Sequence, residues 1–386
     1  MKKRPDCYHH MACWCWLLLL WQLSWFHMAE SGFTSIKISD QPGWKNVTIP
    51  ADGIYIVGVT ADSSYGYRPR THIRVSLRRP HFKLGYFITY ASDIISHAEA
   101  AVALKQNDTL TLAVSGSMQD PDSFSVAYVS GLDGHYTTVV TTSASKSAIL
   151  PFNKQLTANS WSGLSKNESS SFSVPTTGMY WVTARVVPIN KFVVISVTTE
   201  NSTSTRFLFN VYGEKDRAVS CSGAFRLTAG SVVKANNSVP ATFAEDTMLS
   251  FVYLEGNRKP HTGPDEQIAF TACLTSKLQR SHHQVVPFPG HITNYGRLYT
   301  NNGHITIRRS GSYIIHLRPD PPSDASAMID LTVNGRFTWR SYSKMGVASG
   351  QTISLVLKAN DKLMVLSHLT HIFETGTLFS IAFLRS

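Results

Sequence analysis

The stretch from Ile305 to Leu317 reads I-T-I-R-R-S-G-S-Y-I-I-H-L, and two earlier stretches repeat its pattern. One is F-S-V-P-T-T-G-M-Y-W-V-T-A from Phe172, and the other is V-T-I-P-A-D-G-I-Y-I-V-G-V from Val47. In all three, an apolar residue stands six positions before a glycine and a tyrosine stands two positions after it. The pattern predicts a short strand, a turn at the glycine, and a second strand in which apolar positions alternate with others.

Each copy is followed by a matching closing strand. The closing strands read S-F-S-V-A-Y-V from Ser123, M-L-S-F-V-Y-L from Met248 and L-F-S-I-A-F-L from Leu378. The repeat recurs after roughly 130 residues, which indicates tandem domains rather than a solenoid of short units.

Composition agrees with an all-β chain of several domains. At 386 residues a single core is not expected, and the hydrophobic content of 43% is ordinary for a globular protein. Val, Ile, Thr, Ser and Tyr in short alternating runs dominate, and this favours strands over helices.

A family resemblance rests on residues of the third repeat. They are A-F-T-A at Ala269, P-F at Pro287, T-N-Y-G at Thr293 and G-S-Y-I-I at Gly311, with Phe288, Asn294 and Tyr299 at the family's spacing. On these residues the repeat resembles the globular C1q domain, a jelly roll related to tumour necrosis factor. The second repeat keeps P-F at Pro151, then Phe172, Gly178 and Tyr180. The first keeps Gly53 and Tyr55 but lacks the P-F stretch, so we expect its opening strands to be shortened or rebuilt.

The resemblance implies three tandem jelly-roll β-sandwiches, at residues 30–131, 132–257 and 258–386. Domains of this family generally pack three at a time, and a separate copy would leave an apolar flank in water. The chain has no Gly-X-Y tract that could form a collagen stalk, and its linkers are short. We therefore expect one chain to fold as an intramolecular pseudo-trimer that is monomeric in solution.

The N-terminus has the pattern of a targeting segment. Lys2, Lys3 and Arg4 precede an apolar run from Met11 to Phe26. We interpret residues 1–29 as a signal peptide, which predicts a secreted, extracellular mature chain that does not span a membrane. The alternative is an uncleaved signal anchor, for which the run is short.

Five cysteines occur, and only Cys221 and Cys273 lie beyond the targeting segment. A disulfide between them is one interpretation, and two free thiols that pack as small apolar groups are the other.

Five Asn-x-Ser/Thr sequons predict N-glycosylation, all in the first two repeats: Asn46, Asn107, Asn167, Asn201 and Asn236.

The first repeat contains the densest basic stretch, G-Y-R-P-R-T-H-I-R-V-S-L-R-R-P-H-F-K from Gly66. Alternation on a strand would place apolar residues on one face and basic residues on the other. The stretch predicts either a solvated strand face or an anion-binding surface formed by Arg68, Arg70, Arg74, Arg78, Arg79 and Lys83. A net charge of +11 agrees with an anionic partner.

The sequence contains no G-x-S-x-G, no phosphate-binding glycine loop and no H-E-x-x-H, so no enzyme activity, cofactor or catalytic residue is predicted. His282, His283, His291 and His304 have no acidic partner nearby in the sequence, and no metal site is expected. Some members of the family bind calcium, but no motif here assigns calcium ligands.

We expect a recognition protein of the innate-immune type that binds an extracellular polyanion, a glycan or a protein receptor, and not nucleic acid. The alternatives are a receptor ligand resembling tumour necrosis factor and a structural matrix component.

Overall fold

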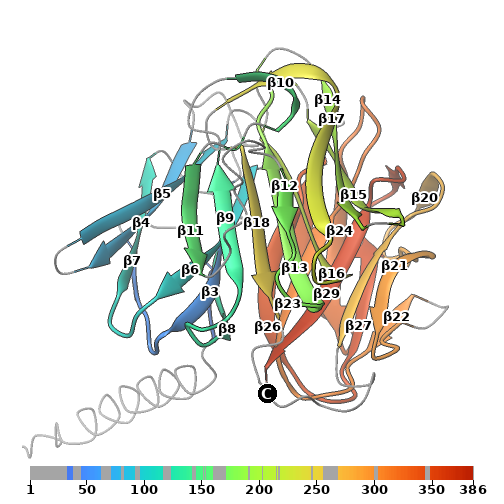
Figure 1. Ribbon diagram of the computed structural model, residues 1–386. Coiled ribbons are helices and arrows are strands. Elements are labelled where there is room, and N and C mark those ends of the chain that lie inside the picture. Colours follow the sequence, from blue (N-terminus) through green and yellow to red (C-terminus); the bar gives the residue numbers. More distant parts are fainter. Residues whose placement is uncertain are drawn as a thin grey trace, which may run out of the picture.

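The structure is a computed structural model. It describes residues 33–37, 45–61, 71–79, 82–91, 96–115, 123–140, 145–150, 152, 154–159, 171–189, 192–201, 203–213, 215, 218–244, 247–254, 268–299, 303–343 and 348–385. The described chain is all-β, with every named strand pairing antiparallel, as predicted (Figure 1). No helix in these ranges is long and apolar enough to span a membrane.

The first sandwich comprises β1 to β8. Their bounds are β1 Phe33–Lys37, β2 Lys45–Thr48, β3 Gly53–Ala61, β4 Thr71–Arg79, β5 Phe82–Ala91, β6 Ser96–Leu104, β7 Thr109–Ser115 and β8 Ser123–Ser130. Its inner sheet has the order β1-β8-β3-β6 and its outer sheet has the order β2-β7-β4-β5.

The second sandwich comprises β9 to β18. Their bounds are β9 Tyr136–Val140, β10 Ser145–Ile149, β11 Lys154–Asn159, β12 Ser171–Ser173, β13 Gly178–Val186, β14 Val193–Glu200, β15 Thr205–Gly213, β16 Val219–Leu227, β17 Val232–Phe243 and β18 Met248–Tyr253. Its inner sheet has the order β11-β9-β18-β13-β16, and its outer sheet has the order β10-β17-β14-β15, with β12 also paired to β17.

The third sandwich comprises β19 to β29. Their bounds are β19 Ala269–Cys273, β20 Leu278–Arg280, β21 Gly290–Tyr295, β22 His304–Thr306, β23 Gly311–Arg318, β24 Ala327–Val333, β25 Arg336–Ser343, β26 Gln351–Leu357, β27 Lys362–Ser367, β28 His371–Phe373 and β29 Leu378–Arg385. Its inner sheet has the order β21-β19-β29-β23-β26 and its outer sheet has the order β22-β27-β24-β25, while β20 pairs with β28.

The same strand order thus occurs three times. In each inner sheet the closing strand lies between the opening strand and the strand that begins at the motif glycine, which is the non-sequential pairing of a jelly roll. The inner sheet of the first sandwich has four described strands, whereas the other two have five. The shortening of the opening strands in the first copy stays a prediction.

The glycine and tyrosine of the repeated motif have structural roles. In each copy the tyrosine hydroxyl donates to the carbonyl four residues earlier at 2.7 Å: Tyr55 to Ala51, Tyr180 to Thr176 and Tyr313 to Arg309. The glycine leaves room for an aromatic ring of the closing strand, because a Cβ on Gly178 would lie 2.4 Å from Cε2 of Tyr253. The motif therefore locks the closing strand against the strand that begins at the glycine.

Two turns of the third sandwich use left-handed backbone. Asn334 and Gly335 join β24 to β25 with positive φ angles of 53° and 75°. Asn360 likewise has a φ of 72°, and the carboxylate of Asp361 accepts the N–H of Lys358 at 2.7 Å. Both pairs use the tolerance of Asn and Gly for left-handed backbone.

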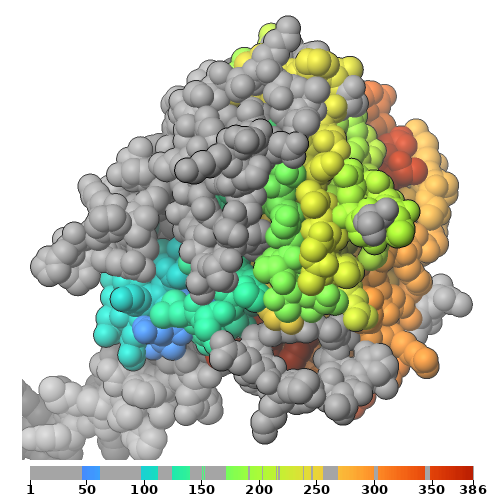
Figure 2. All heavy atoms as spheres, viewed as in Figure 1, coloured from blue at the N-terminus to red at the C-terminus, as the bar shows by residue number. Residues whose placement is uncertain are grey.

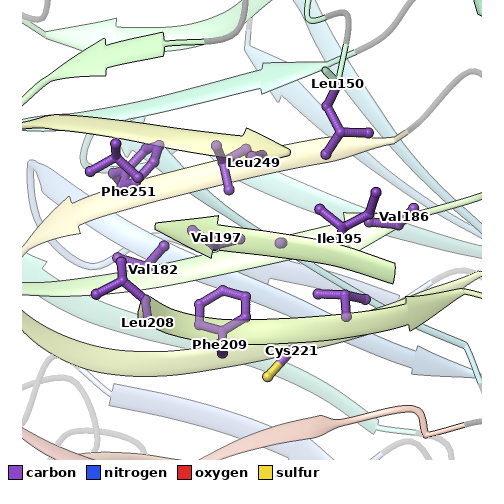
Figure 3. Packing of buried hydrophobic residues seen from close by; sticks show 14 of the residues in the cluster. Leu150, Val182, Val186, Ile195, Val197, Leu208, Phe209, Cys221, Leu249 and Phe251 are labelled. Atoms are coloured by element: carbon purple, nitrogen blue, oxygen red, sulfur yellow. The ribbon is translucent and has the colours of Figure 1, made fainter. Parts of the chain in front are cut away.

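A core of buried apolar side chains fills the space between the two sheets of each of the second and third sandwiches. In the second, Val182 of β13 and Leu249 of β18 lie across from Ile195 and Val197 of β14 (Figure 3). All nine residues of β13 are buried, although the motif predicts alternation. The reason is that the second face of β13 is covered as well, by neighbouring sandwiches.

Candidate functional site

The inner-sheet edge strands join the three sandwiches in a closed ring. β6 contacts β9, β11, β13 and β18 of the second sandwich, and β16 contacts β19, β21, β23 and β29 of the third. β26 of the third returns to contact β1, β3 and β8 of the first. Each sandwich therefore offers one edge strand to the next, so the fold has the intrachain pseudo-trimer arrangement that the sequence predicts.

Apolar side chains from all three sandwiches meet at the centre of this ring. The cluster includes Ile56 of the first, Trp181 and Ala224 of the second, and Ile314 and Ala382 of the third, all buried. Burial of this surface stabilises the ring in proportion to its apolar area.

The serines of two closing strands, Ser250 and Ser380, bind across the boundaries of the ring. The N–H of Ala224 on edge strand β16 donates to Thr271 Oγ1 at 3.0 Å and to Ser380 Oγ at 3.1 Å in the third sandwich. The N–H of Ala101 on β6 makes the same pair of contacts with the second sandwich, through Thr138 at 3.1 Å and Ser250 at 3.0 Å. An edge strand presents unpaired N–H groups, and here hydroxyl groups of the next sandwich satisfy them.

A buried polar cluster, which we call the polar junction, lies beside these contacts. Its members are His97 and Glu99 on β6, Trp181 and Thr183 on β13, Ser222 on β16, His316 on β23 and Thr352 on β26. The three sandwiches all contribute to it, and its seven residues are separated by up to 255 positions in the sequence.

Glu99 is 1% exposed and binds across the boundary between the first and second sandwiches. Its Oε1 accepts from Trp181 Nε1 at 2.6 Å and from Thr183 Oγ1 at 2.5 Å. Its Oε2 lies 3.5 Å from His97 Nε2. Burial opposes ionisation of Glu99, but the hydrogen bond and charge of His97 and the hydrogen bond from Thr183 outweigh it and lower the pKa.

His316 links the second and third sandwiches. The N–H of Ser222 donates to His316 Nε2 at 3.1 Å, so Nδ1 carries the proton and donates to Thr352 Oγ1 at 3.0 Å. Burial, together with the charges of His97 and Arg318, holds the pKa of His316 well below its usual value of 6.5. The imidazole is therefore neutral at physiological pH.

Arg318 makes a second buried link between these sandwiches. Its Nη1 donates to the carbonyl of Asn210 at 2.7 Å, its Nε donates to the carbonyl of Ala348 at 3.3 Å, and its guanidinium lies 5.6 Å from the ring centroid of Tyr212. Burial raises the pKa of Asp320 despite the opposing charge of Arg318. These contacts, like the polar junction, specify how the sandwiches join, because partnered buried polar groups tolerate few alternative arrangements.

The predicted anion-binding residues lie in the outer sheet of the first sandwich or outside the described residues. Arg74, Arg78 and Arg79 belong to β4 and Lys83 belongs to β5, with Arg78 paired to Lys83 in register. Arg68 and Arg70 lie outside the described residues. The register also pairs Leu77 with Leu110, which is buried, and Arg78 with Thr109.

The predicted glycosylation sites are at the surface where the structure describes them. Asn46, Asn107 and Asn201 are exposed, Asn236 is half-buried in β17, and Asn167 lies outside the described residues. The Oδ1 atom of Asn201 accepts from the N–H of Thr203 at 3.0 Å, which holds the sequon in a turn. Glycosylation itself stays a prediction.

Cysteines and histidines can be placed in the same way. Cys221 and Cys273 are free thiols, and burial raises the pKa of both, so the disulfide interpretation is not supported.

His282 and His283 stack with ring centroids 3.7 Å apart, while His291 packs on Phe270 and Tyr299. Among the described residues, no group of three His, Cys, Asp or Glu side chains is placed to hold a metal ion. The predicted signal peptide, residues 1–29, lies outside the described ranges.

Sequence reasoning missed the polar junction. The available signal was Glu99, a single carboxylate within the alanine-rich strand S-H-A-E-A-A-V-A-L. An acid in such a strand needs a partner, but the partners Trp181 and Thr183 are 82 and 84 residues away and carry no motif.

Comparisons with known proteins give only distant similarities. No family model matches the chain, and no curated protein matches its sequence. Among solved structures, the globular domain of zebrafish complement 1qA protein is 14% identical with a TM-score of 0.26, covering 31% of this chain and 98% of that one. Murine APRIL at pH 5.0 is 19% identical with a TM-score of 0.27, covering 31% of this chain and 99% of that one. Eiger TNF from S. frugiperda is 14% identical with a TM-score of 0.27, covering 34% and 99%. Because these TM-scores are low, the description of the fold rests on the strand pairings instead.

Proposed function

We propose that the chain is a secreted, non-enzymatic recognition protein that binds an anionic extracellular ligand, in the manner of innate-immune proteins of the C1q type. The observation that carries the proposal is the closed ring of sandwiches, in which β6, β16 and β26 each contact the next inner sheet. The ring joins three outer sheets, with separate sequences, in one molecule (Figure 1). Each outer sheet can therefore carry a different binding chemistry.

The outer sheets of the three sandwiches differ in the charges of their side chains. In the second sandwich, Ser196 and Asn210 form a neutral hydrogen bond at 2.8 Å between β14 and β15. At the matching strands of the third, Asp330 binds Arg340 at 2.7 Å and His368 at 2.9 Å, so its charges are paired. Only the first sandwich carries the dense basic stretch on β4 and β5. We assign ligand binding to Arg74, Arg78, Arg79 and Lys83, with Arg68 and Arg70 beside them in sequence.

A recognition role also agrees with the chemistry of the interior. Every member of the polar junction is buried, so its carboxylate and imidazoles are removed from solutes. Their hydrogen bonds connect sandwiches, which is a structural role. We therefore assign no catalytic residue, and the protein acts by binding.

A protein receptor is the second candidate, favoured by one boundary between sandwiches. Arg206 Nη2 donates to the carbonyl of Ile292 at 2.9 Å, which brings the start of β15 to the third sandwich. The neighbouring Phe207 is 47% exposed at this boundary. Exposed aromatic side chains are common anchors of protein–protein interfaces.

The test compares retention on immobilised heparin with binding to lipid A vesicles. The variant R74S/R78S/R79S should be retained more weakly on heparin, because it removes three basic side chains of β4, and a thermal unfolding scan checks that the variant still folds. Retention by the unmodified protein should fall steeply with salt, because exposed charges are screened. Unchanged retention of the variant would exclude β4 as the binding surface, and a receptor interaction lost specifically in Phe207→Ser would favour the second candidate.

A further inference from the structure

The third sandwich carries its own concentration of positive charge, away from β4. Six exposed basic residues lie in four loops, or at the strand ends next to them, at one end of this sandwich: Arg297, Arg308, Arg309, Arg336, Lys358 and Lys362. We call this set the third-sandwich basic end. The segments 296–299, 308–310, 334–336 and 358–362 are all described, and they contain a single carboxylate, Asp361.

Hydrogen bonds hold the four loops together. Arg308 Nη2 lies 3.4 Å from the carbonyl of Arg297, and the N–H of Ala359 donates to Ser310 Oγ at 2.9 Å. The N–H of Lys362 donates to Asn334 Oδ1 at 2.9 Å, which brings the turn before Arg336 to the same place. The charges therefore occupy one surface although they come from residues spread over 66 positions of the chain.

The six positive charges of this surface outnumber its one acid, Asp361. Asp361 Oδ2 accepts from the N–H of Lys358 at 2.7 Å, and Oδ1 accepts from Asn334 Nδ2 at 2.8 Å. Both carboxylate oxygens are thus engaged in shaping the turn. The lysine and arginine head groups around it extend from exposed positions.

The other two sandwiches provide an internal comparison. The loop before each motif glycine has the same backbone contact, because Ile49, Val174 and Ile307 each donate to the matching loop carbonyl at 2.8 Å. The next two residues are Pro50-Ala51 in the first copy and Pro175-Thr176 in the second, but Arg308-Arg309 in the third. The fold therefore does not require basic residues here, and their presence in one copy needs another explanation.

We infer that the third-sandwich basic end is a second anion-binding site, separate from β4, and that its ligand is a linear sulfated glycan chain. All six side chains are exposed and come from different loops, so one anion can contact several of them only if it carries charges along its length. The guanidinium fork matches the geometry of sulfate and phosphate oxygens. No sequon lies in the third repeat, so its own N-glycans would not cover this end.

The site lies at the end of the third sandwich where β23 begins and β29 ends, near the C-terminus in Figure 1. In Figure 2 the described atoms of the third sandwich, coloured orange to red, lie on the right, and those of the first, coloured blue to cyan, lie on the left. A chain bound to the basic end and a ligand bound to β4 would therefore contact different sandwiches.

The test uses the full-length secreted protein and heparin as the probe. K358Q/K362Q removes two charges but keeps the hydrogen bonds that these lysines donate through their backbone N–H groups. R308Q/R309Q tests the neighbouring loop independently. Lys215, exposed in a loop at the opposite end of the second sandwich, provides the control K215Q, which is compared with the single variants K358Q and K362Q.

We expect each variant of the basic end to bind heparin at least about fivefold more weakly, while the control keeps its affinity. Desulfated heparin should bind neither the unmodified protein nor the variants at this site. If the control loses as much heparin affinity as the variants of the basic end, binding depends on net charge alone and the inference is overturned. Unchanged binding of K358Q/K362Q and R308Q/R309Q would overturn it as well. Stronger binding to phosphatidylserine vesicles than to heparin, lost in the same variants, would also overturn it in favour of a lipid surface.

The two anion sites can be separated. If only the β4 site exists, R74S/R78S/R79S alone loses heparin binding and the variants of the basic end behave as the unmodified protein. If only the site at the basic end exists, the variants K358Q/K362Q and R308Q/R309Q lose heparin binding and R74S/R78S/R79S behaves as the unmodified protein. Failure of one proposal therefore leaves the other intact.

Discussion

The backbone N–H of Ser222 donates to His316 Nε2 at 3.1 Å across the boundary between the second and third sandwiches. The same imidazole uses Nδ1 for Thr352, so both ring nitrogens are engaged and only the neutral form fits. A proton added at Nε2 would face the N–H of Ser222. The join between two sandwiches is therefore sensitive to the protonation of one side chain.

Acidification should weaken the folded state through His316. Its pKa is lowered in the native protein, so below about pH 6.5 the unfolded state binds more protons than the native state, and stability falls as pH falls. We expect the thermal unfolding temperature to decrease from pH 7 to pH 5. His316→Gln should flatten this dependence in part, since the pKa of His371 is lowered too. The exposed His282→Gln is the control, and an identical pH profile in all three proteins would contradict the assignment.

Removal of the carboxylate of Glu99 should destabilise the ring. Glu99→Ala leaves Trp181 Nε1 and Thr183 Oγ1 without their acceptor in a buried site, and we expect a loss of about 3 kcal/mol in the free energy of unfolding. Glu99→Gln keeps an acceptor oxygen and should cost less. Denaturant unfolding followed by tryptophan fluorescence measures both, and a fully stable Glu99→Ala would show that these contacts contribute little.

The motif glycine should be coupled energetically to the closing-strand aromatic ring. Gly178→Ala places a Cβ 2.4 Å from Cε2 of Tyr253, and overpacking of this kind costs about 1–3 kcal/mol. Tyr253→Leu removes the ring and should relieve that clash. A double-mutant cycle on unfolding free energies therefore predicts that G178A/Y253L loses less stability than the two single variants together. Additive losses would mean that the glycine is needed for another reason.

One chain should form one compact particle in solution. The edge-strand N–H groups of Ala101 and Ala224 are already paired with hydroxyl groups within the chain, so these edges have no need of a second copy. Light scattering with size exclusion should give the mass of a single chain. A three-chain particle or an elongated monomer would contradict this expectation.

Local rules made much of the fold predictable from sequence. The glycine and tyrosine pattern marked β3, β13 and β23, and the closing motifs marked β8, β18 and β29, because turn geometry and strand alternation depend on nearby residues. The turn at Asn334-Gly335 was equally local. The all-β class and the pairing of sandwiches within one chain followed from the repeat and its family resemblance.

Contacts between distant residues could not be read in the same way. Glu99 meets Trp181, and Ser222 meets His316, only after three sandwiches have closed into a ring, and neither pair has a sequence spacing that encodes it. The six charges of the third-sandwich basic end are unremarkable in sequence, where they are scattered among neutral residues. Hydrogen bonds between backbone and side-chain atoms of neighbouring loops bring them onto one surface, because strand pairing places residues by register rather than by distance along the chain.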